Sequence, residues 1–207
     1  MNLKVTVTGG AGFIGSYLCE ALANLGQDVT IIDNLSSGTR NNLRELLKTS
    51  GVTLIIGDCK DRADVEKAIA KADIVYHFAA NPEVRIEFAD PSTCFRENIY
   101  ATHILLEAIG HSSVDTIVFA STSTVYGDAK TIPTPENYSP LEPISIYGAS
   151  KLSSEALITS YCKTYKKKAV ILRLANIVGP RSRHGVINDF ITKLRRNTKK
   201  LEILGDG

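Results

Sequence analysis

The strongest constraint on the fold is a regular alternation of short apolar runs with longer segments of helical periodicity. The apolar runs lie at residues 4–7, 29–33, 53–56, 73–78, 116–121 and 169–174, and they are rich in valine and isoleucine. Strands that are apolar almost throughout are typical of a parallel sheet that is covered on both faces. Helical patterns occupy residues 13–25, 41–48, 61–70, 94–109, 147–165 and 186–196. This order predicts a doubly wound α/β fold.

The composition describes a globular chain with one sizeable core. Of its 207 residues, 43% are hydrophobic and 22% are charged, which excludes a disordered or fibrous architecture. The 24 basic and 22 acidic residues leave a formal charge of only +2, so nucleic acid is not an expected partner. The four cysteines form no Cys-x-x-Cys pair, which favours buried, reduced thiols in a cytoplasmic protein over disulfides or a metal site. No apolar run reaches membrane-spanning length, and no membrane partner is expected.

A glycine-rich turn follows the first apolar run directly. Residues 9–15 read Gly-Gly-Ala-Gly-Phe-Ile-Gly, which fits GxxGxxG counted from Gly9 and GxGxxG counted from Gly10. Because the turn lies between a strand and an amphipathic helix, it can bring a pyrophosphate to the helix N-terminus. Gly12 would let the backbone approach the phosphate, and Gly15 would let helix and sheet pack closely. The alternative is a glycine turn in an α/β protein that binds no nucleotide.

Polar residues stand where the following strands end. Asp33 closes the second strand, where an acid accepts hydrogen bonds from the adenosine ribose. Its charge repels a 2′-phosphate, which favours NAD over NADP. Asp58 follows the third strand, where it either borders a ligand or caps the next helix. His77 ends the fourth strand and is expected to be a packed, hydrogen-bonded histidine rather than a catalyst.

A tyrosine and a lysine share one face at the start of the helix expected over 147–165. Tyr147 and Lys151 are four residues apart, so their side chains project from the same side. A positive charge near a phenol favours the phenolate, so we expect Lys151 to lower the pKa of Tyr147 and make it a proton acceptor. Residues 121–123, Ser-Thr-Ser, can present a hydroxyl to the same cleft. A dinucleotide, a base, a cation and a hydroxyl together predict a hydride-transfer site.

Over essentially all 207 residues, the sequence resembles the extended short-chain dehydrogenases/reductases that act on nucleotide sugars. The motifs that carry the resemblance are residues 9–15, 33–38 (Asp-Asn-Leu-Ser-Ser-Gly), 77–80 (His-Phe-Ala-Ala), Asn98, 121–127 (Ser-Thr-Ser-Thr-Val-Tyr-Gly), 147–151 and 173–181 (Arg-Leu-Ala-Asn-Ile-Val-Gly-Pro-Arg). Within the family, residues 33–38 are most similar to UDP-glucose 4-epimerases. The resemblance implies a single NAD-binding domain of Rossmann type over 1–207, in which residues 176–207 begin the substrate-binding region.

The resemblance also implies which residues meet each ligand. Residues 34–38 would wrap the adenosine, Asp58 and Cys59 would flank the adenine, and residues 78–80 would line the diphosphate. The implied NAD-binding set is Gly9, Gly12, Phe13, Ile14, Gly15, Asp33, Asn34, Ser36, Ser37, Gly38, Asp58, Cys59, Phe78, Ala79, Ala80, Asn98, Ser121, Tyr147 and Lys151. The implied catalytic residues are Thr122, Tyr147 and Lys151, and the implied substrate contacts are Thr122, Tyr147, Asn176 and Arg181.

The implied activity is epimerisation of a UDP-hexose at C4 through a transient 4-keto sugar, as between UDP-glucose and UDP-galactose. Tyr147 would remove the proton of the C4 hydroxyl, Thr122 would orient the C4 oxygen, and Lys151 would hold the nicotinamide ribose. Family dehydratases usually carry Asp-Glu after the threonine, whereas this chain has Ser123 and Thr124, which offer no acid or base for eliminating water. Two alternatives stay open: another nucleotide-sugar enzyme such as a dehydratase, and an NAD-binding module without catalysis.

The remaining expectations concern the end of the chain, its long helices and its arginines. Family members continue beyond a Gly-Asp-Gly segment into a smaller region that closes over the sugar, and this sequence stops at that segment. We therefore expect a truncated chain, in which turnover suffers more than cofactor binding. The helices that begin at Cys94 and Tyr147 resemble those through which the family dimerises, which predicts a homodimer. Arg181, Arg183 and Arg85 are candidates for a diphosphate contact.

Overall fold

A six-stranded parallel sheet is the centre of the computed structural model, which describes residues 2–82, 90–183 and 185–203. The strands are β1 (Lys4–Thr8), β2 (Asp28–Asp33), β3 (Val52–Ile56), β4 (Ile74–His77), β5 (Thr116–Thr122) and β6 (Lys168–Leu174). Their order is β3-β2-β1-β4-β5-β6, so the direction of winding reverses between β1 and β4. The predicted fold class is confirmed, and each predicted strand end lies within one residue of the observed one.

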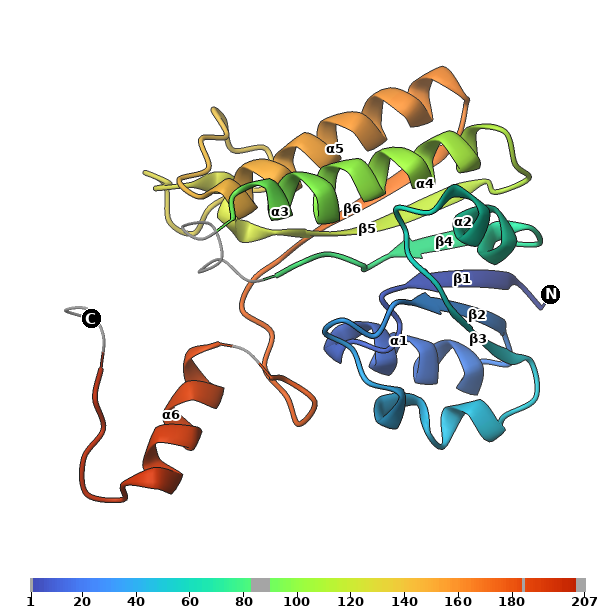
Figure 1. The fold of residues 1–207 in the computed structure, drawn as a ribbon. Helices are drawn as coiled ribbons and strands as arrows, with labels where there is room; N and C mark the ends of the chain where they lie inside the picture. The colour runs from blue at the N-terminus through green and yellow to red at the C-terminus, as the bar shows by residue number, and fades with distance from the viewer. Residues whose placement is uncertain (1, 83–89, 184, 204–207) are drawn as a thin grey trace. The chain divides into compact units, whose positions relative to one another are not determined.

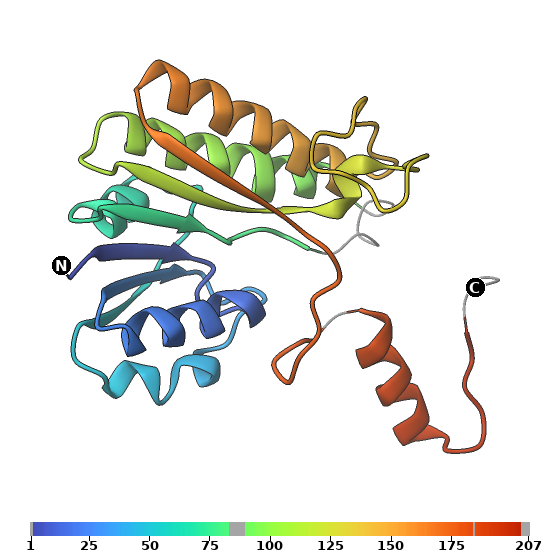
Figure 2. The same cartoon turned by 180° about the vertical axis from the view of Figure 1, so that it is seen from behind.

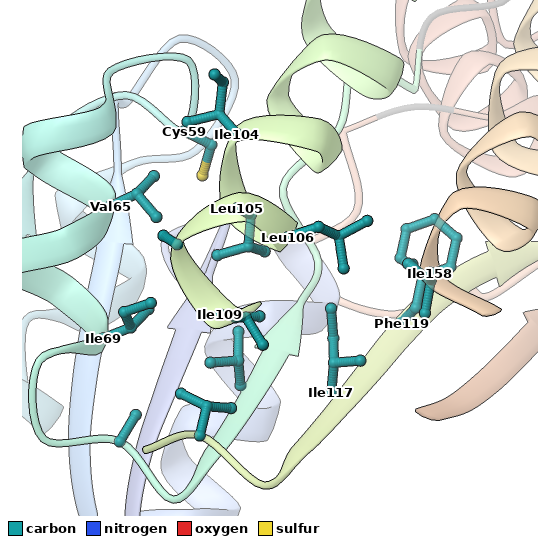
Figure 3. Packing of buried hydrophobic residues seen from close by; sticks show 14 of the residues in the cluster. Cys59, Val65, Ile69, Ile104, Leu105, Leu106, Ile109, Ile117, Phe119 and Ile158 are labelled. Carbon is teal, nitrogen blue, oxygen red and sulfur yellow. The ribbon is translucent and has the colours of Figure 1, made fainter. Parts of the chain in front are cut away.

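Helices cover both faces of this sheet (Figures 1 and 2). Helix α1 (Phe13–Asn24) lies on one face, where Cys19 and Leu22 pack with buried residues of β1 and β2. Helices α2 (Arg62–Ile69), α4 (Ala101–Gly110) and α5 (Ile146–Thr164) lie on the other face. Figure 3 shows the larger core there, in which Leu105 of α4 and Ile158 of α5 are fully buried with Phe119 of β5. Each such side chain contributes about 1.5–3 kcal/mol by leaving water.

The segment expected as a helix over 41–48 instead forms two short 3-10 turns, η1 (Arg40–Leu43) and η2 (Leu46–Lys48). The Thr39 hydroxyl accepts a hydrogen bond from the backbone N–H of Asn41, and the Asn42 amide donates to the carbonyl of Ala11. The contact with Ala11 joins residues 31 positions apart, and a tertiary contact of this kind can override a local preference for a helix. The segment is therefore tied to the glycine turn.

The helix expected over 94–109 is interrupted near its start. It consists of α3 (Ser92–Cys94), a π-helical segment η4 (Phe95–Tyr100) and α4. The carbonyl of Asn98, inside η4, accepts hydrogen bonds from the hydroxyls of Thr102 and Ser154. A π-helical turn accommodates an additional residue, and such turns are frequent at functional sites.

The chain divides into two compact units, Met1–Ala175 and Asn176–Gly207. The sheet and all helices up to α5 belong to the first unit. The second contains α6 (Val186–Arg196), in which no residue is buried and apolar side chains such as Ile187 and Leu194 are exposed. None of the helices in the described ranges combines the length and the apolar character needed to cross a membrane.

Candidate active site

The glycine turn between β1 and α1 is closed by its own backbone. The N–H of Gly12 donates to the carbonyl of Gly9 at 3.1 Å, and the N–H of Gly9 donates to Ile32 at 2.9 Å. Gly9 has φ +71°, and a Cβ there would lie only 2.6 Å from the backbone nitrogen of Ala79. A Cβ at Gly15 would lie 2.3 Å from the carbonyl oxygen of Gly9. Glycines at these two positions let α1 and the segment after β4 approach the turn.

The start of α1 is suited to an anionic group. Its N-cap is Gly12, which has no side chain to offer an acceptor to the first N–H groups of the helix. Those groups can therefore be offered to a phosphate, as the helix dipole favours. Residues 78–80 run beside the turn, because the N–H groups of Phe78 and Ala79 donate to the carbonyl and hydroxyl of Thr8. This cradle fits the diphosphate of a dinucleotide.

Asp33 joins the end of β2 to the glycine turn. One carboxylate oxygen accepts a hydrogen bond from the N–H of Ala11 and the other from the N–H of Leu35, both at 2.8 Å. The N–H of Thr39 donates to the carbonyl of Ala11, which brings the loop 34–38 over the same turn. Each carboxylate oxygen can accept more than one hydrogen bond, so Asp33 keeps the capacity to accept from ribose hydroxyls.

Asp58 belongs to a charged cluster at the end of β3. Its Oδ2 accepts from Asn34 at 3.0 Å and from the Lys60 ammonium at 2.9 Å, and Lys60 also contacts Glu97 at 2.6 Å. Partial burial raises the pKa of Asp58, but the hydrogen bonds from Lys60 and Asn34 outweigh it and hold the pKa below its usual value. The helix α2 is capped by Asp61. The alternative in which Asp58 is the cap is therefore wrong.

Cys59 takes part in the core. Its side chain is buried with Val65, Ile69 and Ile104 (Figure 3). Burial, followed by the nearby charge of Asp58, raises the pKa of its thiol to about 12. The backbone of Cys59, and not its thiol, is thus the part that can border a ligand. All four cysteine thiols are buried, as expected.

Asn98 connects two walls of the site. Its Oδ1 accepts from the N–H of Asn81 at 2.8 Å, and its Nδ2 donates to the Ser150 hydroxyl at 2.9 Å. The side chain is 2% exposed, so its amide is used within the protein. Asn98 therefore supports the site by joining the segment after β4 to α5.

Thr122 and Tyr147 stand on adjoining elements. Thr122 is the last residue of β5, and its hydroxyl accepts from the N–H of Thr124 in the 3-10 turn η5 (Ser123–Tyr126). Tyr147 is in the first turn of α5, just before Gly148. A Cβ at Gly148 would lie 3.1 Å from the carbonyl oxygen of Thr124, so the start of α5 approaches η5 closely. The hydroxyl of Thr122 and the phenol of Tyr147 thus come from neighbouring segments.

The pKa of Tyr147 is raised in this structure, whereas the sequence led us to expect a lowered value. Lys151 is 3% exposed, and its ammonium lies 4.3 Å from the centre of the Phe119 ring. Burial lowers the pKa of Lys151 to about 7, although Glu155 acts against the shift. Burial, with a smaller effect of Cys94, raises the pKa of Tyr147. The ammonium is packed in the core, and desolvation dominates both groups.

His77 and Ser121 are engaged within the protein. His77 is hydrogen-bonded to Thr8 at 2.8 Å and to Thr102 at 3.0 Å, as expected for a packed histidine. Burial, and then the charge of Lys151, lowers its pKa to about 3, so it is neutral near pH 7. The Ser121 hydroxyl donates to Glu155 at 2.5 Å. Neither side chain is directed by these bonds toward a ligand.

Two expected substrate residues lie in the second unit. Asn176 and Arg181 are described there separately from the site, so their contact with a substrate stays a prediction. Arg85 lies outside the described residues. Among the residues that the structure describes, no three His, Cys, Asp or Glu side chains form a group that could hold a metal ion.

The sequence reasoning missed the charged residues behind the site. Lys60 and Glu97 meet only in the fold, and nothing in their spacing indicates that they do. Glu155 carries a detectable signal, because it lies four residues after Lys151 and thus on the buried face of the same helix.

The chain is similar to known proteins over most of its length. A family model described as the NAD dependent epimerase/dehydratase family matches residues 5–207. The crystal structure of a UDP-galactose 4-epimerase is 48% identical, with a TM-score of 0.86 over 95% of this chain and 64% of that one. The structure of a UDP-glucuronic acid 4-epimerase from Bacillus cereus with UDP-glucuronic acid and NAD is 38% identical, with a TM-score of 0.90 over 99% of this chain and 67% of that one.

Curated relatives include more than one activity. The UDP-glucose 4-epimerase of Corynebacterium glutamicum is 36% identical over 177 residues, which cover 86% of this chain and 52% of the relative. The dTDP-D-glucose 4,6-dehydratase of Mus musculus is 34% identical over 202 residues, which cover 95% of this chain and 57% of the relative. The chain spans 52% to 67% of the lengths of these relatives and solved structures.

Proposed function

The chain belongs to the NAD dependent epimerase/dehydratase family, and on that premise we propose that it epimerises a UDP-hexose at C4. The observation that carries the proposal is the placement of Thr122 and Tyr147 on adjoining elements of a fold whose glycine turn suits a dinucleotide. Relatives named as UDP-sugar 4-epimerases, one of them solved with a UDP-sugar and NAD, support this substrate class.

The cofactor would be held at the end of the sheet where β1 and β2 terminate. Its diphosphate would meet the first N–H groups of α1 at Gly12, and its adenosine ribose would meet Asp33. When bound, NAD would supply an acceptor, and then a donor, for a hydride at C4 of the sugar. The negative charge of Asp33 supports NAD over NADP.

The proposed reaction requires a base, an orienting hydroxyl and a cation from this chain. Tyr147 accepts the proton of the C4 hydroxyl and later returns it, and Thr122 orients the C4 oxygen through its own hydroxyl. Because burial raises the pKa of Tyr147, its phenolate needs a nearby cation. Lys151, one helical turn further along, is the residue that can supply that cation.

Dehydration is the main competing reaction within the family. Dehydratases of the family usually carry Asp-Glu directly after the threonine, whereas Ser123 and Thr124 follow Thr122 here. The hydroxyl of Thr124 donates to the hydroxyl of Thr122 at 3.1 Å. The turn η5 thus offers hydroxyl groups but no carboxyl group that could exchange a proton during elimination. This composition favours epimerisation.

The test is conversion of UDP-galactose to UDP-glucose with NAD supplied, followed by separation of the two sugars. We expect conversion by the wild type and none above background for Tyr147→Phe, which removes only the phenol oxygen. NAD binding, measured by calorimetry, should be within twofold for both. NAD binding without conversion of UDP-galactose, UDP-glucuronic acid or a UDP-N-acetylhexosamine would indicate a non-catalytic module. A 4-keto-6-deoxy product would indicate a dehydratase.

We also propose that the protein forms a homodimer through α4 and α5. Tyr161 of α5 is within hydrogen-bonding distance of His103 of α4, at 3.2 Å, so the two helices are joined to each other. Sedimentation at micromolar concentration should give twice the mass of one chain. A monomer under those conditions would contradict the proposal.

A further inference from the structure

A partly buried ion pair joins α5 to β6 beside the end of β5, where Arg173 is the register partner of Ser121. The guanidinium of Arg173, on β6, contacts the carboxylate of Glu155, on α5, through Nη2 at 2.8 Å and through Nε at 3.1 Å. The side chain of Glu155 is 6% exposed and that of Arg173 is 22% exposed. Two parallel contacts of this kind fix the orientation of both groups more strictly than a single bond does.

The same carboxylate is bonded to the end of β5. The hydroxyl of Ser121 donates to Oε1 of Glu155 at 2.5 Å, and Ser121 directly precedes Thr122. A displacement of α5 along the sheet would break this bond. The carboxylate of Glu155 therefore relates the strand that carries Thr122 to the helix that carries Tyr147.

Arg173 extends the connection to the segment after Thr122. Its Nη1 donates to the carbonyl of Glu136 at 3.1 Å, and its guanidinium lies 4.9 Å from the centre of the Tyr126 ring. Tyr126 ends the turn η5, and Glu136 belongs to the proline-rich loop 127–145. One side chain thus contacts three segments that surround the end of β5.

The spacing on α5 completes the arrangement. Tyr147, Lys151 and Glu155 follow one another at intervals of four residues, so they lie on one face of the helix. A helix fixed at Glu155 is also fixed in its rotation at Lys151 and Tyr147. We propose that Ser121, Glu155 and Arg173 are positioning residues, which hold Thr122 at the distance from Tyr147 that proton transfer at C4 requires. This inference rests on the proposed function.

The energetics of buried charges are consistent with such a role. Replacing a buried ion pair by apolar residues is often neutral for stability, whereas removing one partner is costly. A contribution to stability is therefore not a sufficient reason for this ion pair to be present. The hydrogen bond from Ser121 to Glu155 is the contact to test for positioning, because it can be removed while the ion pair stays intact.

The test compares Ser121→Ala with Ser121→Thr, which restores a hydroxyl. We expect Ser121→Ala to lower kcat for UDP-sugar conversion by about tenfold or more, because small misplacements are costly in catalysis. The KM and the dissociation constant for NAD should change by less than about twofold, and Ser121→Thr should keep kcat within about threefold of wild type. Combining Ser121→Ala with Glu155→Ala should lower kcat no further than Glu155→Ala alone, because each substitution removes the same hydrogen bond.

The matched control is Ile158→Val, a small core change one helical turn after Glu155 on α5. It should reduce the melting temperature as much as Ser121→Ala, or more, and leave kcat unchanged. An unchanged kcat in Ser121→Ala would overturn the proposal. So would parallel losses of kcat, NAD affinity and melting temperature, because they would mean a purely structural role.

Amide hydrogen exchange tests the positioning without turnover. In Ser121→Ala, exchange should become faster at residues 122–127 and stay unchanged at the glycine turn, residues 9–15. If the wild type shows no conversion, the proposed function fails, and this exchange pattern still decides whether Ser121 positions the end of β5. Unchanged exchange at 122–127 would overturn the inference in either case.

Discussion

The ammonium of Lys151 lies 4.3 Å from the centre of the Phe119 ring, where the helix α5 packs on β5. A lysine that is 3% exposed loses most of its hydration, and burial lowers its pKa from an ordinary 10.5 to about 7. A buried cation in this position costs the fold stability. The protein therefore keeps a charge in its core that the fold alone does not require.

Replacing Lys151 by methionine should stabilise the protein. The unfolded chain keeps this lysine protonated to about pH 10, whereas the folded chain releases the proton near pH 7. The folded state thus binds fewer protons across that window, and its stability rises with pH there. In Lys151→Met, we expect the free energy of unfolding at pH 7 to rise by about 1–3 kcal/mol and its increase between pH 7 and 10 to weaken.

The measurement is denaturant unfolding at several pH values for the wild type and the variant. Lys151→Arg is a matched control, because arginine keeps its charge throughout this range. It should be less stable than the wild type. A methionine variant that is less stable than the wild type at pH 7 would mean that the lysine contributes favourably to the fold.

Alanine at Gly12 and at Gly15 should have different effects. A Cβ at Gly15 would lie 2.3 Å from the carbonyl oxygen of Gly9, so Gly15→Ala should lower stability by about 2 kcal/mol or more. A Cβ at Gly12 would have its nearest contact at 3.1 Å, which a small shift can relieve. Gly12→Ala should therefore unfold near the wild-type temperature and bind NAD about tenfold more weakly. Equal losses of stability in both variants would contradict this difference between the two glycines.

Asp33 should determine the choice between NAD and NADP. Its carboxylate repels a 2′-phosphate, and Asp33→Asn removes that charge while keeping the size of the side chain. We expect the ratio of NADP to NAD dissociation constants to fall by about tenfold or more. Some stability should also be lost, because the amide nitrogen would face the N–H of Ala11 or Leu35. An unchanged ratio, measured by calorimetry, would remove Asp33 from the ribose site.

The four thiols should be unreactive in the folded protein. All of them are buried, and burial raises the pKa of Cys19 and of Cys59 to about 12. Because the thiolate is the reactive form, iodoacetamide at pH 8 should modify none of them within the time that a denatured sample needs for complete modification. Mass spectrometry of intact protein measures this. Rapid labelling of Cys59 in the native state would show that its side chain faces the site.

The strands and the glycine turn could be predicted because their signals are local. Apolar runs predict buried parallel strands, and the spacing of Gly9, Gly12 and Gly15 between a strand and a helix predicts the turn. The helix expected over 41–48 failed for a non-local reason. The side chain of Asn42 bonds to Ala11, which lies far away in the sequence, and the segment forms 3-10 turns instead.

The electrostatics of the site could not be predicted from spacing. An interval of four residues places Tyr147 and Lys151 on one helical face, but it does not say how deep that face lies. Burial reverses the expected effect on Tyr147 and lowers the pKa of Lys151. The contacts of Glu155 with Ser121 and Arg173 depend on the pairing of β5 with β6, so they emerge only in the fold.

The central claim is that C4 of the sugar is oxidised and then reduced, and an isotope label at C4 tests it most directly. UDP-galactose with deuterium at C4 should be converted to UDP-glucose that keeps the deuterium at C4, with a slower rate than the unlabelled sugar. Tyr147→Phe should not convert it. Conversion that replaces the deuterium by solvent hydrogen, or that proceeds with no change in rate in single turnovers, would contradict hydride transfer at C4.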